Sequence, residues 1–252
     1  MMKNWSNEQI ESHRRAAKIL DQIMADTFDF ISKNKNDIDE YQVQQFIFRQ
    51  FAKNNLVTEE EPPIVAFGHN TENVHYFPSE HNCAKLKPND LIMIDIWARE
   101  DGLGDKPFAD ITWMGFNGKE MPSDQTRIFD LVIEARDSAV GLIEESLAVQ
   151  KMPVLGSLDR KVHQIFRAHN AEANFLHTTG HVLGFYGAHG DKAGILDEKN
   201  LNKVMANVGY TIEPGLYFTK QFGVRSEIDF YVDDEFNIII TTEVQKSVVM
   251  LG

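Results

Sequence analysis

Two acidic residues interrupt segments of this chain that are otherwise apolar. Asp95 lies in Leu91–Trp97, where every other residue is apolar, and Asp110 lies in the largely apolar segment Ala109–Phe116. Segments of this composition predict buried strands, and a buried carboxylate requires a partner. That partner is either an arginine or a metal ion, so the fold must bring these strands to a compensating positive charge.

Three more residues stand in similarly distinctive contexts. His181 lies in HTTGHVLG, Glu213 in YTIEPGLYF and Glu227 in GVRSEIDF. With Asp95 and Asp110 they make four carboxylates and one imidazole, without a thiolate. Two divalent cations would balance four buried carboxylates, whereas one would leave negative charge uncompensated. Oxygen-rich ligation with one imidazole favours Mn, Co, Fe or Zn, and a two-metal site with room for a bridging water is typical of hydrolases.

The five contexts, in this order, resemble those of the dinuclear metallopeptidases, the group of methionine aminopeptidases, Xaa-Pro aminopeptidases and prolidases. The combination of TTGH, TIEPGLY and GVRSE is specific, and the resemblance extends from about Ser6 to near the C-terminus. It implies the pita-bread fold, which is also found in creatinase. In this α/β (α+β) fold, two pseudo-symmetric halves combine a curved antiparallel sheet with outer helices.

The resemblance also implies a role for each ligand. Asp95 chelates one metal ion, while His181 and Glu213 bind the other. Asp110 and Glu227 bridge both ions. A hydroxide that bridges the ions would attack the scissile carbonyl, and Glu213 would take and return the proton.

Four further residues are expected around the ligands. His177 precedes the metal histidine by four positions on an extended segment, so both side chains point to the same side. His75 and His189 resemble substrate-side histidines of the family, although His189 is displaced by one position and its place in the site is left open. Arg225 is expected on the same strand face as Glu227, where it would hold a ligand carboxylate by a charge-assisted hydrogen bond.

Asp110 has two rivals, Asp101 and Asp105, in the insert Arg99–Phe108. This insert makes the spacing between Asp95 and Asp110 longer than the family leads us to expect. We favour Asp110 because Asp-Ile-Thr before an aromatic residue is the family context and because a strand holds the side chain rigidly. The rivals are expected in a solvated turn. Four other histidines are expected at exposed positions: His13, His81, His163 and His169.

Hydrophobic periodicity and turn residues give the expected elements. Helices are predicted over Ser6–Ile31, Asp39–Lys53, Asp124–Gln150 and Leu158–His169. Strands are predicted over Leu91–Trp97, Ala109–Phe116, Gly209–Ile212, Gly223–Val232, Ile238–Thr241 and Ser247–Leu251. Ile47-Phe48-Arg49 in the first helix pair is echoed by Ile165-Phe166-Arg167 in the second. This weak repeat supports two similar halves.

Composition narrows the class of protein. The 252 residues are 42% hydrophobic and contain no low-complexity linker, so we expect one catalytic domain over residues 1–252, without a separate N-terminal domain. The formal net charge of -13 disfavours nucleic-acid binding. A single cysteine, Cys83, and the lack of an export signal or an apolar membrane span indicate a cytoplasmic enzyme. The resemblance implies a homodimer.

His177 and Arg225 favour the Xaa-Pro-cleaving branch of the family over the methionine-removing branch. The expected substrate is therefore a small peptide with proline after the scissile bond, and the sequence leaves dipeptidase or aminopeptidase action open. Two other functions remain as alternatives: hydrolysis of a non-peptide C–N bond, as in creatinase, and a non-catalytic binding module on the same scaffold.

Overall fold

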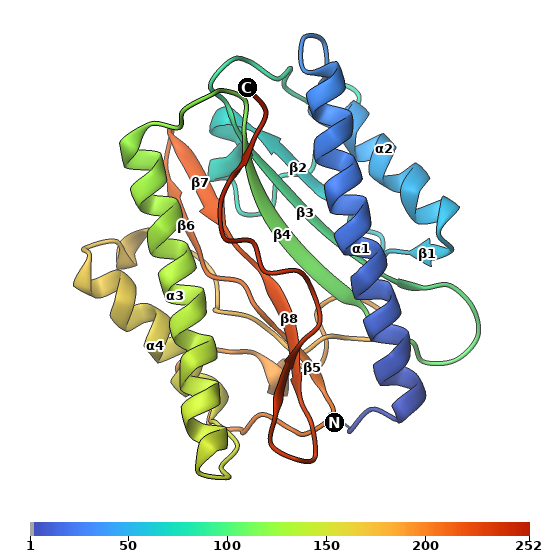
Figure 1. The fold of residues 1–252 in the computed structure, drawn as a ribbon, viewed down its shortest axis with the longest axis vertical. Helices are drawn as coiled ribbons and strands as arrows, with labels where there is room; N and C mark the ends of the chain where they lie inside the picture. Colours follow the sequence, from blue (N-terminus) through green and yellow to red (C-terminus); the bar gives the residue numbers. More distant parts are fainter. Residues whose placement is uncertain (1–2) are drawn as a thin grey trace.

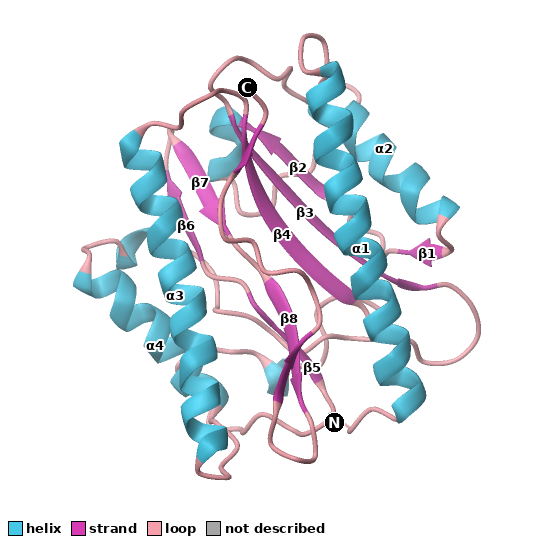
Figure 2. Ribbon diagram, viewed as in Figure 1, coloured by secondary structure: helices cyan, strands magenta, loops and turns pink. Residues whose placement is uncertain are grey.

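The computed structural model describes residues 3–252, and two pairs of helices flank its strands (Figures 1 and 2). The helices are α1 (Asn7–Asn34), α2 (Glu40–Lys53), α3 (Ser123–Ala148) and α4 (Leu155–Ala168), with short 3-10 helices η1 (Gly68–Glu72), η2 (Glu172–Asn174) and η3 (Lys192–Gly194). The strands are β1 (Leu56–Val57), β2 (Ile64–Phe67), β3 (Leu91–Glu100), β4 (Ala109–Phe116), β5 (Gly209–Ile212), β6 (Gly215–Phe218), β7 (Phe222–Arg225), β8 (Ile228–Val232), β9 (Ile238–Ile240) and β10 (Val249–Met250).

Each half of the molecule consists of a helix pair followed by antiparallel strands. In the first half, β3 pairs with β1, β2 and β4, and the short β10 lies parallel to β4. In the second half, β8 lies between β5 and β9, while β6 pairs with β7. No helix among residues 3–252 combines the length and the apolar character needed to cross a membrane.

Local signals fix where the first two helices begin. Ser6 and Gln9 form a capping box at the start of α1, and Asp39 and Gln42 form another at the start of α2. In each box the cap side chain accepts a hydrogen bond from the backbone N–H of the glutamine, and the glutamine side chain accepts one from the backbone N–H of the cap residue. These four polar residues therefore set the two helices that cover the first half of the sheet.

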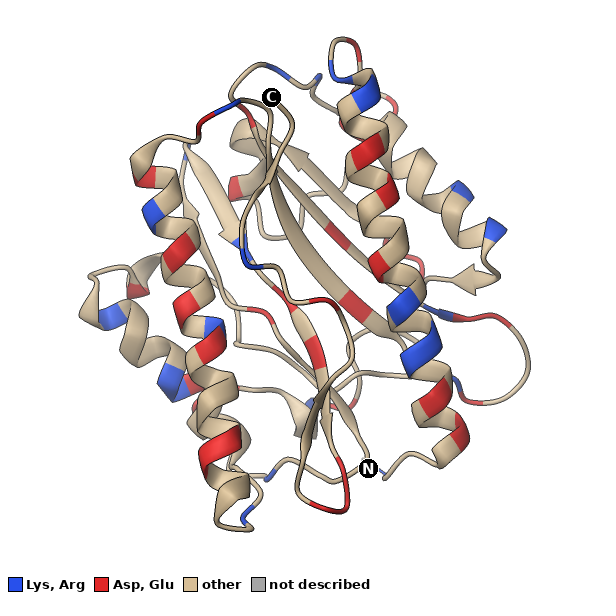
Figure 3. Cartoon of the chain, in the orientation of Figure 1, with Lys and Arg blue, Asp and Glu red and all other residues tan. Residues whose placement is uncertain are grey.

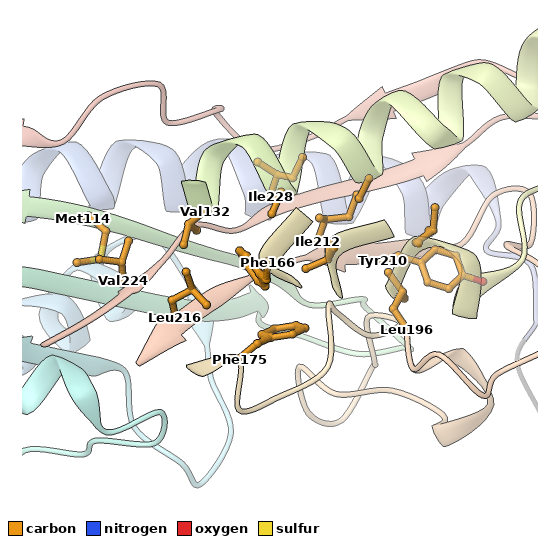
Figure 4. Close-up of a cluster of buried hydrophobic side chains, with 14 of the residues drawn as sticks. Met114, Val132, Phe166, Phe175, Leu196, Tyr210, Ile212, Leu216, Val224 and Ile228 are labelled. Atoms are coloured by element: carbon orange, nitrogen blue, oxygen red, sulfur yellow. The ribbon is translucent and has the colours of Figure 1, made fainter. Parts of the chain in front are cut away.

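Strand β3 separates two hydrophobic cores. Ile94 and Ile96 pack into the core beneath α1 and α2, whereas Met93 and Trp97 pack into the larger core against α3 and α4. Figure 4 shows side chains of the larger core, in which Met114 of β4 meets residues from the helices, strands and loops of the second half. Because side chains alternate along a strand, Asp95 lies on the face of Met93 and Trp97, toward the interior between the two halves.

The expected strand Gly223–Val232 is interrupted, which corrects the prediction of one continuous strand. It ends as β7 at Arg225 and resumes as β8 at Ile228. The partner strand stops at Ile212 and resumes at Gly215, and both sides of the gap keep one register. That register places Glu213 opposite Glu227 and Pro214 opposite Ser226. The interruption follows because Pro214 has no N–H to donate to the ladder.

The remaining boundaries differ only slightly from expectation. Helix α1 continues to Asn34, and α4 already begins at Leu155. The last two predicted strands are shorter, as β9 and β10. Three short strands escaped prediction, β1, β2 and β6, because their apolar runs are too brief to carry a periodic signal.

His13 is buried, which contradicts its expected exposed position. Its side chain is 0% exposed, Nδ1 lies 2.9 Å from the carbonyl oxygen of Phe108, and Nε2 lies 2.7 Å from the hydroxyl of Thr241. The imidazole thus ties α1 to the chain before β4 and to the chain after β9. Burial lowers the pKa of His13 from 6.5 to about 4.

This buried histidine predicts a pH-dependent stability. The unfolded chain protonates His13 below pH 6.5, whereas the folded protein protonates it only near pH 4, so stability is lost as the pH falls through this window. Between about pH 7.5 and pH 5 we expect His13 to remove about 2 kcal/mol of unfolding free energy. Urea unfolding of the parent and of His13→Asn at both pH values measures this, since asparagine does not titrate. An equal pH dependence in the two proteins would contradict the prediction.

Candidate metal centre

A cavity of about 140 Å³ lies where the strands of the two halves meet. All nine residues predicted for the site line it: Asp95, Asp110, His181, Glu213, Glu227, His75, His177, His189 and Arg225. A wider groove of about 890 Å³, near the start of α3, contains none of the nine. Acidic residues colour the central strands as well as the long helices in Figure 3, so part of the negative charge of this chain lies inside the molecule.

The two strand pairs each contribute two carboxylates. On β3 and β4, Asp95 is paired with Thr112, and Asp110 is paired with Trp97, so the two acids lie diagonally across the pair. In the second half, Glu213 and Glu227 occupy the opposed gaps between strands. There, their backbone N–H groups donate to other segments of the chain and not to each other's strand. Glu213 N donates to the carbonyl of Thr179 at 2.8 Å, and Glu227 N lies 3.3 Å from the carbonyl of Thr112.

His181 reaches the carboxylates from an extended segment beside β5. Its backbone N donates to the hydroxyl of Thr211 at 3.0 Å, and its carbonyl accepts from Thr211 N at 2.8 Å. The ring Nδ1 lies 3.1 Å from the carbonyl of Val182, which can only accept, so Nδ1 carries the proton. Nε2 therefore presents a lone pair to the site, as metal-binding histidines do. It lies 3.2 Å from Glu213 Oε1 and 3.8 Å from Asp110 Oδ2.

The carboxylates repel one another strongly. Burial, and then the neighbouring Glu227 and Asp95, raise the pKa of Asp110 well above its ordinary value. Burial, and then Glu213 and Asp95, do the same for the pKa of Glu227. Burial also lowers the pKa of His181 to about 4, so its imidazole is neutral and offers no compensating charge.

This donor set fits divalent cations. One ligand atom from each of Asp110, His181 and Glu227 lies within 4.8 Å of the other two. The lone pair of His181 faces a carboxylate oxygen, an arrangement of two acceptors that only a cation or a proton makes favourable. Oδ1 of Asp95 and Oδ1 of Asp110 are buried and have no hydrogen-bond partner within residues 3–252. Bound cations would give these oxygens a partner and would balance the excess negative charge.

Arg225 brings a positive charge to the carboxylates of the cavity. It is 3% exposed, and its Nη2 donates to Asp95 Oδ2 at 2.6 Å. The prediction placed Arg225 and Glu227 on one strand, but the strand ends between them, at Ser226. Both side chains nevertheless line the cavity. The guanidinium offsets one carboxylate, which leaves three to be balanced.

His177 lies in the cavity wall with both ring nitrogens engaged. Nδ1 lies 2.9 Å from the carbonyl of Thr178, and Nε2 lies 2.9 Å from the hydroxyl of Tyr217. Burial lowers the pKa of His177 to about 3, so the ring is neutral. Nδ1 then carries the proton, and the hydroxyl of Tyr217 donates to Nε2. Tyr217 is a site residue that sequence reasoning missed, because a tyrosine in an apolar strand gives no signal of its own.

His189, whose place in the site the sequence left open, lines the cavity beside His181. Its ring centroid is 4.1 Å from that of His181. The chain folds back on itself between the two histidines, and Gly190 N donates to the carbonyl of Val182 at 2.8 Å. Glu59 supports this loop by accepting a hydrogen bond from Ala188 N at 3.1 Å. His75 also lines the cavity and is exposed.

The structure separates Asp110 from its rivals. Asp101 and Asp105 are exposed in the loop between β3 and β4, away from the cavity. An additional buried acid, Asp229, lies two residues beyond Glu227, and its Oδ2 accepts from Asp110 N at 2.8 Å. Asp229 interrupts an apolar strand as Asp95 does, so the same sequence signal would have identified it.

Two further buried acids hold segments of the site from the outer helices. Asp159 on α4 accepts hydrogen bonds from the backbone N (3.0 Å) and the hydroxyl (2.7 Å) of Thr179, which lies between His177 and His181 in the chain. Glu40 on α2 accepts from Phe67 N, the hydroxyl of Tyr76 and Ala84 N at 2.6, 2.7 and 2.6 Å. Those contacts fix the loop that carries His75.

Comparison with known proteins gives one consistent family. The family described as Metallopeptidase family M24 matches residues 11–234. The chain is 25% identical over 223 residues to an Xaa-Pro dipeptidase of Pyrococcus furiosus, covering 88% of this chain and 58% of that protein. It is 26% identical over 241 residues to an uncharacterised peptidase of Staphylococcus haemolyticus, covering 95% of this chain and 63% of that protein. The chain thus spans about three-fifths of the length of these relatives.

Solved structures give the same fold. An X-Pro aminopeptidase from Thermotoga maritima superposes with a TM-score of 0.82 at 23% identity, over 98% of this chain and 64% of that chain. A dipeptidase from Pyrococcus horikoshii gives 0.81 at 25% identity, over 98% and 63%. The expected α/β pita-bread fold is therefore confirmed.

The geometry predicts that divalent-metal binding requires the carboxylates of the cavity. Asp110→Ala or Glu227→Ala should abolish divalent-metal binding, because each removes an oxygen ligand from the centre of the cluster. Calorimetric titration of each purified variant with Mn²⁺ measures this. Asp101→Ala is the matched control, since this rival is exposed, and it should bind as the parent does. Unchanged binding in either cavity variant would refute the assignment.

Proposed function

Because the chain belongs to metallopeptidase family M24, we propose that it is a metal-dependent peptidase that cleaves the bond between a residue and a following proline. The observation that carries the proposal is the convergence of four carboxylates and one neutral imidazole on one cavity of about 140 Å³. The proposed cofactor is two divalent ions, of Mn, Co, Zn or Fe. Asp95 would hold one ion and His181 with Glu213 the other, while Asp110 and Glu227 would touch both.

The chemistry divides between the ions and the side chains around them. When bound, the ions would lower the pKa of a water molecule so that it attacks a peptide carbonyl at neutral pH. Glu213 is our candidate for the residue that accepts the proton of this water and passes it to the leaving amine. The hydroxyl of Thr211 donates to Glu213 Oε1 at 3.1 Å, which fixes the orientation of the carboxylate.

The histidines take different parts in this proposal. His75 and His189 would donate hydrogen bonds to the peptide as charge develops on its carbonyl oxygen. His177 cannot donate in the arrangement described, since its proton faces Thr178 and its other nitrogen accepts from Tyr217. We therefore assign it to shaping the wall that holds the substrate. Arg225 would fix the orientation of Asp95 through their hydrogen bond of 2.6 Å.

Two observations support proline specificity. The proteins similar to this chain include an Xaa-Pro dipeptidase and an X-Pro aminopeptidase. His177 and Arg225, the residues that favour this branch in the sequence, both line the cavity. The single cysteine fits a reducing compartment, so we place the enzyme in the cytoplasm.

A small peptide panel tests the function. Purified protein would be incubated with Ala-Pro, Ala-Pro-Ala and Met-Ala-Ser, with and without added Mn²⁺ or Co²⁺. We expect metal-dependent release of alanine from the proline peptides and no release of methionine. Preference for the dipeptide or the tripeptide then separates a prolidase from an aminopeptidase. A protein that holds metal but cleaves no peptide would point to a non-peptide C–N bond, and one that neither binds metal nor cleaves would be a binding module.

The assignment of His177 gives a separate prediction. His177→Ala should retain the metal content of the parent while losing about 100-fold in kcat/KM, because the wall loses its contact with Tyr217 but no ligand is removed. Metal analysis and peptide kinetics on one preparation measure both. His81→Ala, at an exposed position, is the control. Loss of metal together with activity would instead make His177 part of the metal centre.

A further inference from the structure

Arg136 is a fully buried arginine on α3 that makes hydrogen bonds to residues outside its own helix. It is 0% exposed and is among the largest fully buried side chains of the described chain. Burying a guanidinium is unfavourable unless its donors are all used, and an apolar side chain would pack against the core without that cost. One edge of the group faces Asp137, whose side chain is 58% exposed, at 2.7 Å.

The other edge of the guanidinium reaches the interrupted strand. Nη1 donates to the hydroxyl of Ser226 at 2.8 Å and to the carbonyl of Gln245 at 2.8 Å. Ser226 and Glu227 are the two residues between β7 and β8, and the backbone N of Ser226 lies 3.2 Å from the carbonyl of Pro214. The arginine therefore contacts the middle of the gap, where the ladder itself provides the fewest hydrogen bonds.

The neighbours of Ser226 are both site residues. On one side, Arg225 holds Asp95 through a contact of 2.6 Å. On the other side, Glu227 accepts a hydrogen bond from the hydroxyl of Thr112 at 2.8 Å. A rotation of the backbone at Ser226 would turn both side chains at once, and small displacements of ligands or orienting groups weaken metal sites and slow catalysis.

The second partner of Arg136 extends the connection to the first half of the molecule. The side chain of Gln245 accepts from Met114 N at 2.8 Å and donates to the carbonyl of Met114 at 2.7 Å. Met114 lies on β4, the strand that carries Asp110. One guanidinium thus joins the gap that bears Glu227 to the strand that bears Asp110.

We propose that Arg136 is a positioning residue that sets the angle of the chain at Ser226, and through it the placement of Arg225 and Glu227 in the metal centre. This inference rests on the proposed function only in that Glu227 ligates metal. A residue of an outer helix would then affect metal affinity through Ser226, although Arg136 itself does not line the cavity.

The test is calorimetric titration of the full chain with Mn²⁺ for Arg136→Met, Ser226→Ala and the double variant. We expect each single variant to bind Mn²⁺ about tenfold more weakly or worse, as the loss of an outer-sphere contact does elsewhere. The double variant should be no weaker than the weaker single one, because both act through one contact. Arg136→Lys should recover part of the affinity, since lysine can still donate to Ser226.

Two controls separate positioning from general damage. Asp137→Asn removes only the exposed partner of Arg136 and should bind Mn²⁺ within about twofold of the parent. Unfolding of Ser226→Ala in EDTA should remain close to that of the metal-free parent. If Arg136→Met does not fold, Ser226→Ala and Asp137→Asn decide the question.

The outcomes distinguish this inference from the proposed function. Parental Mn²⁺ affinity in Ser226→Ala, or additive losses in the double variant, would overturn the positioning role. A parent protein that binds Mn²⁺ but cleaves no peptide would overturn only the peptidase activity. A parent that binds no divalent metal would overturn both.

Discussion

Repulsion among four carboxylates in one small buried cavity is the constraint on which the rest of this structure depends. Glu213 and Glu227 stand opposite each other in the gaps between paired strands, a placement that is unfavourable for like charges. Arg225 compensates one carboxylate, and the neutral His181 compensates none. The strands, the hydrogen bonds from Thr112 and Thr211, and the covering helices hold these groups together against that repulsion. Bound cations would remove much of it.

The sequence allowed the fold and the site to be predicted where the signal is local. Asp95 and Asp110 could be identified because an acid in an apolar strand is conspicuous within a few residues. The helices followed from periodicity and from polar caps. The interruption at Ser226 could not be found this way, since apolar residues continue on both sides. It depends on Pro214 across the ladder, a contact that local patterns do not encode.

The burial of His13 escaped prediction for the same reason. Its two partners lie 95 and 228 residues away in the chain, so no local pattern marks it as interior. The resemblance to a known family supplied the ligand set, but it gave no account of what holds the ligands in place. Tyr217 became recognisable as a site residue only through its contact with His177, whereas Asp229 interrupts an apolar strand as Asp95 does.

The outer helices are more than a cover for the strands. Glu40 on α2, Arg136 on α3 and Asp159 on α4 each send one buried charged side chain to a segment that carries site residues. Variation in these helices can therefore reach the cavity while every ligand stays the same. A lineage built on this scaffold has three separate routes for adjusting its centre, and a laboratory selection for altered metal preference has the same three starting points.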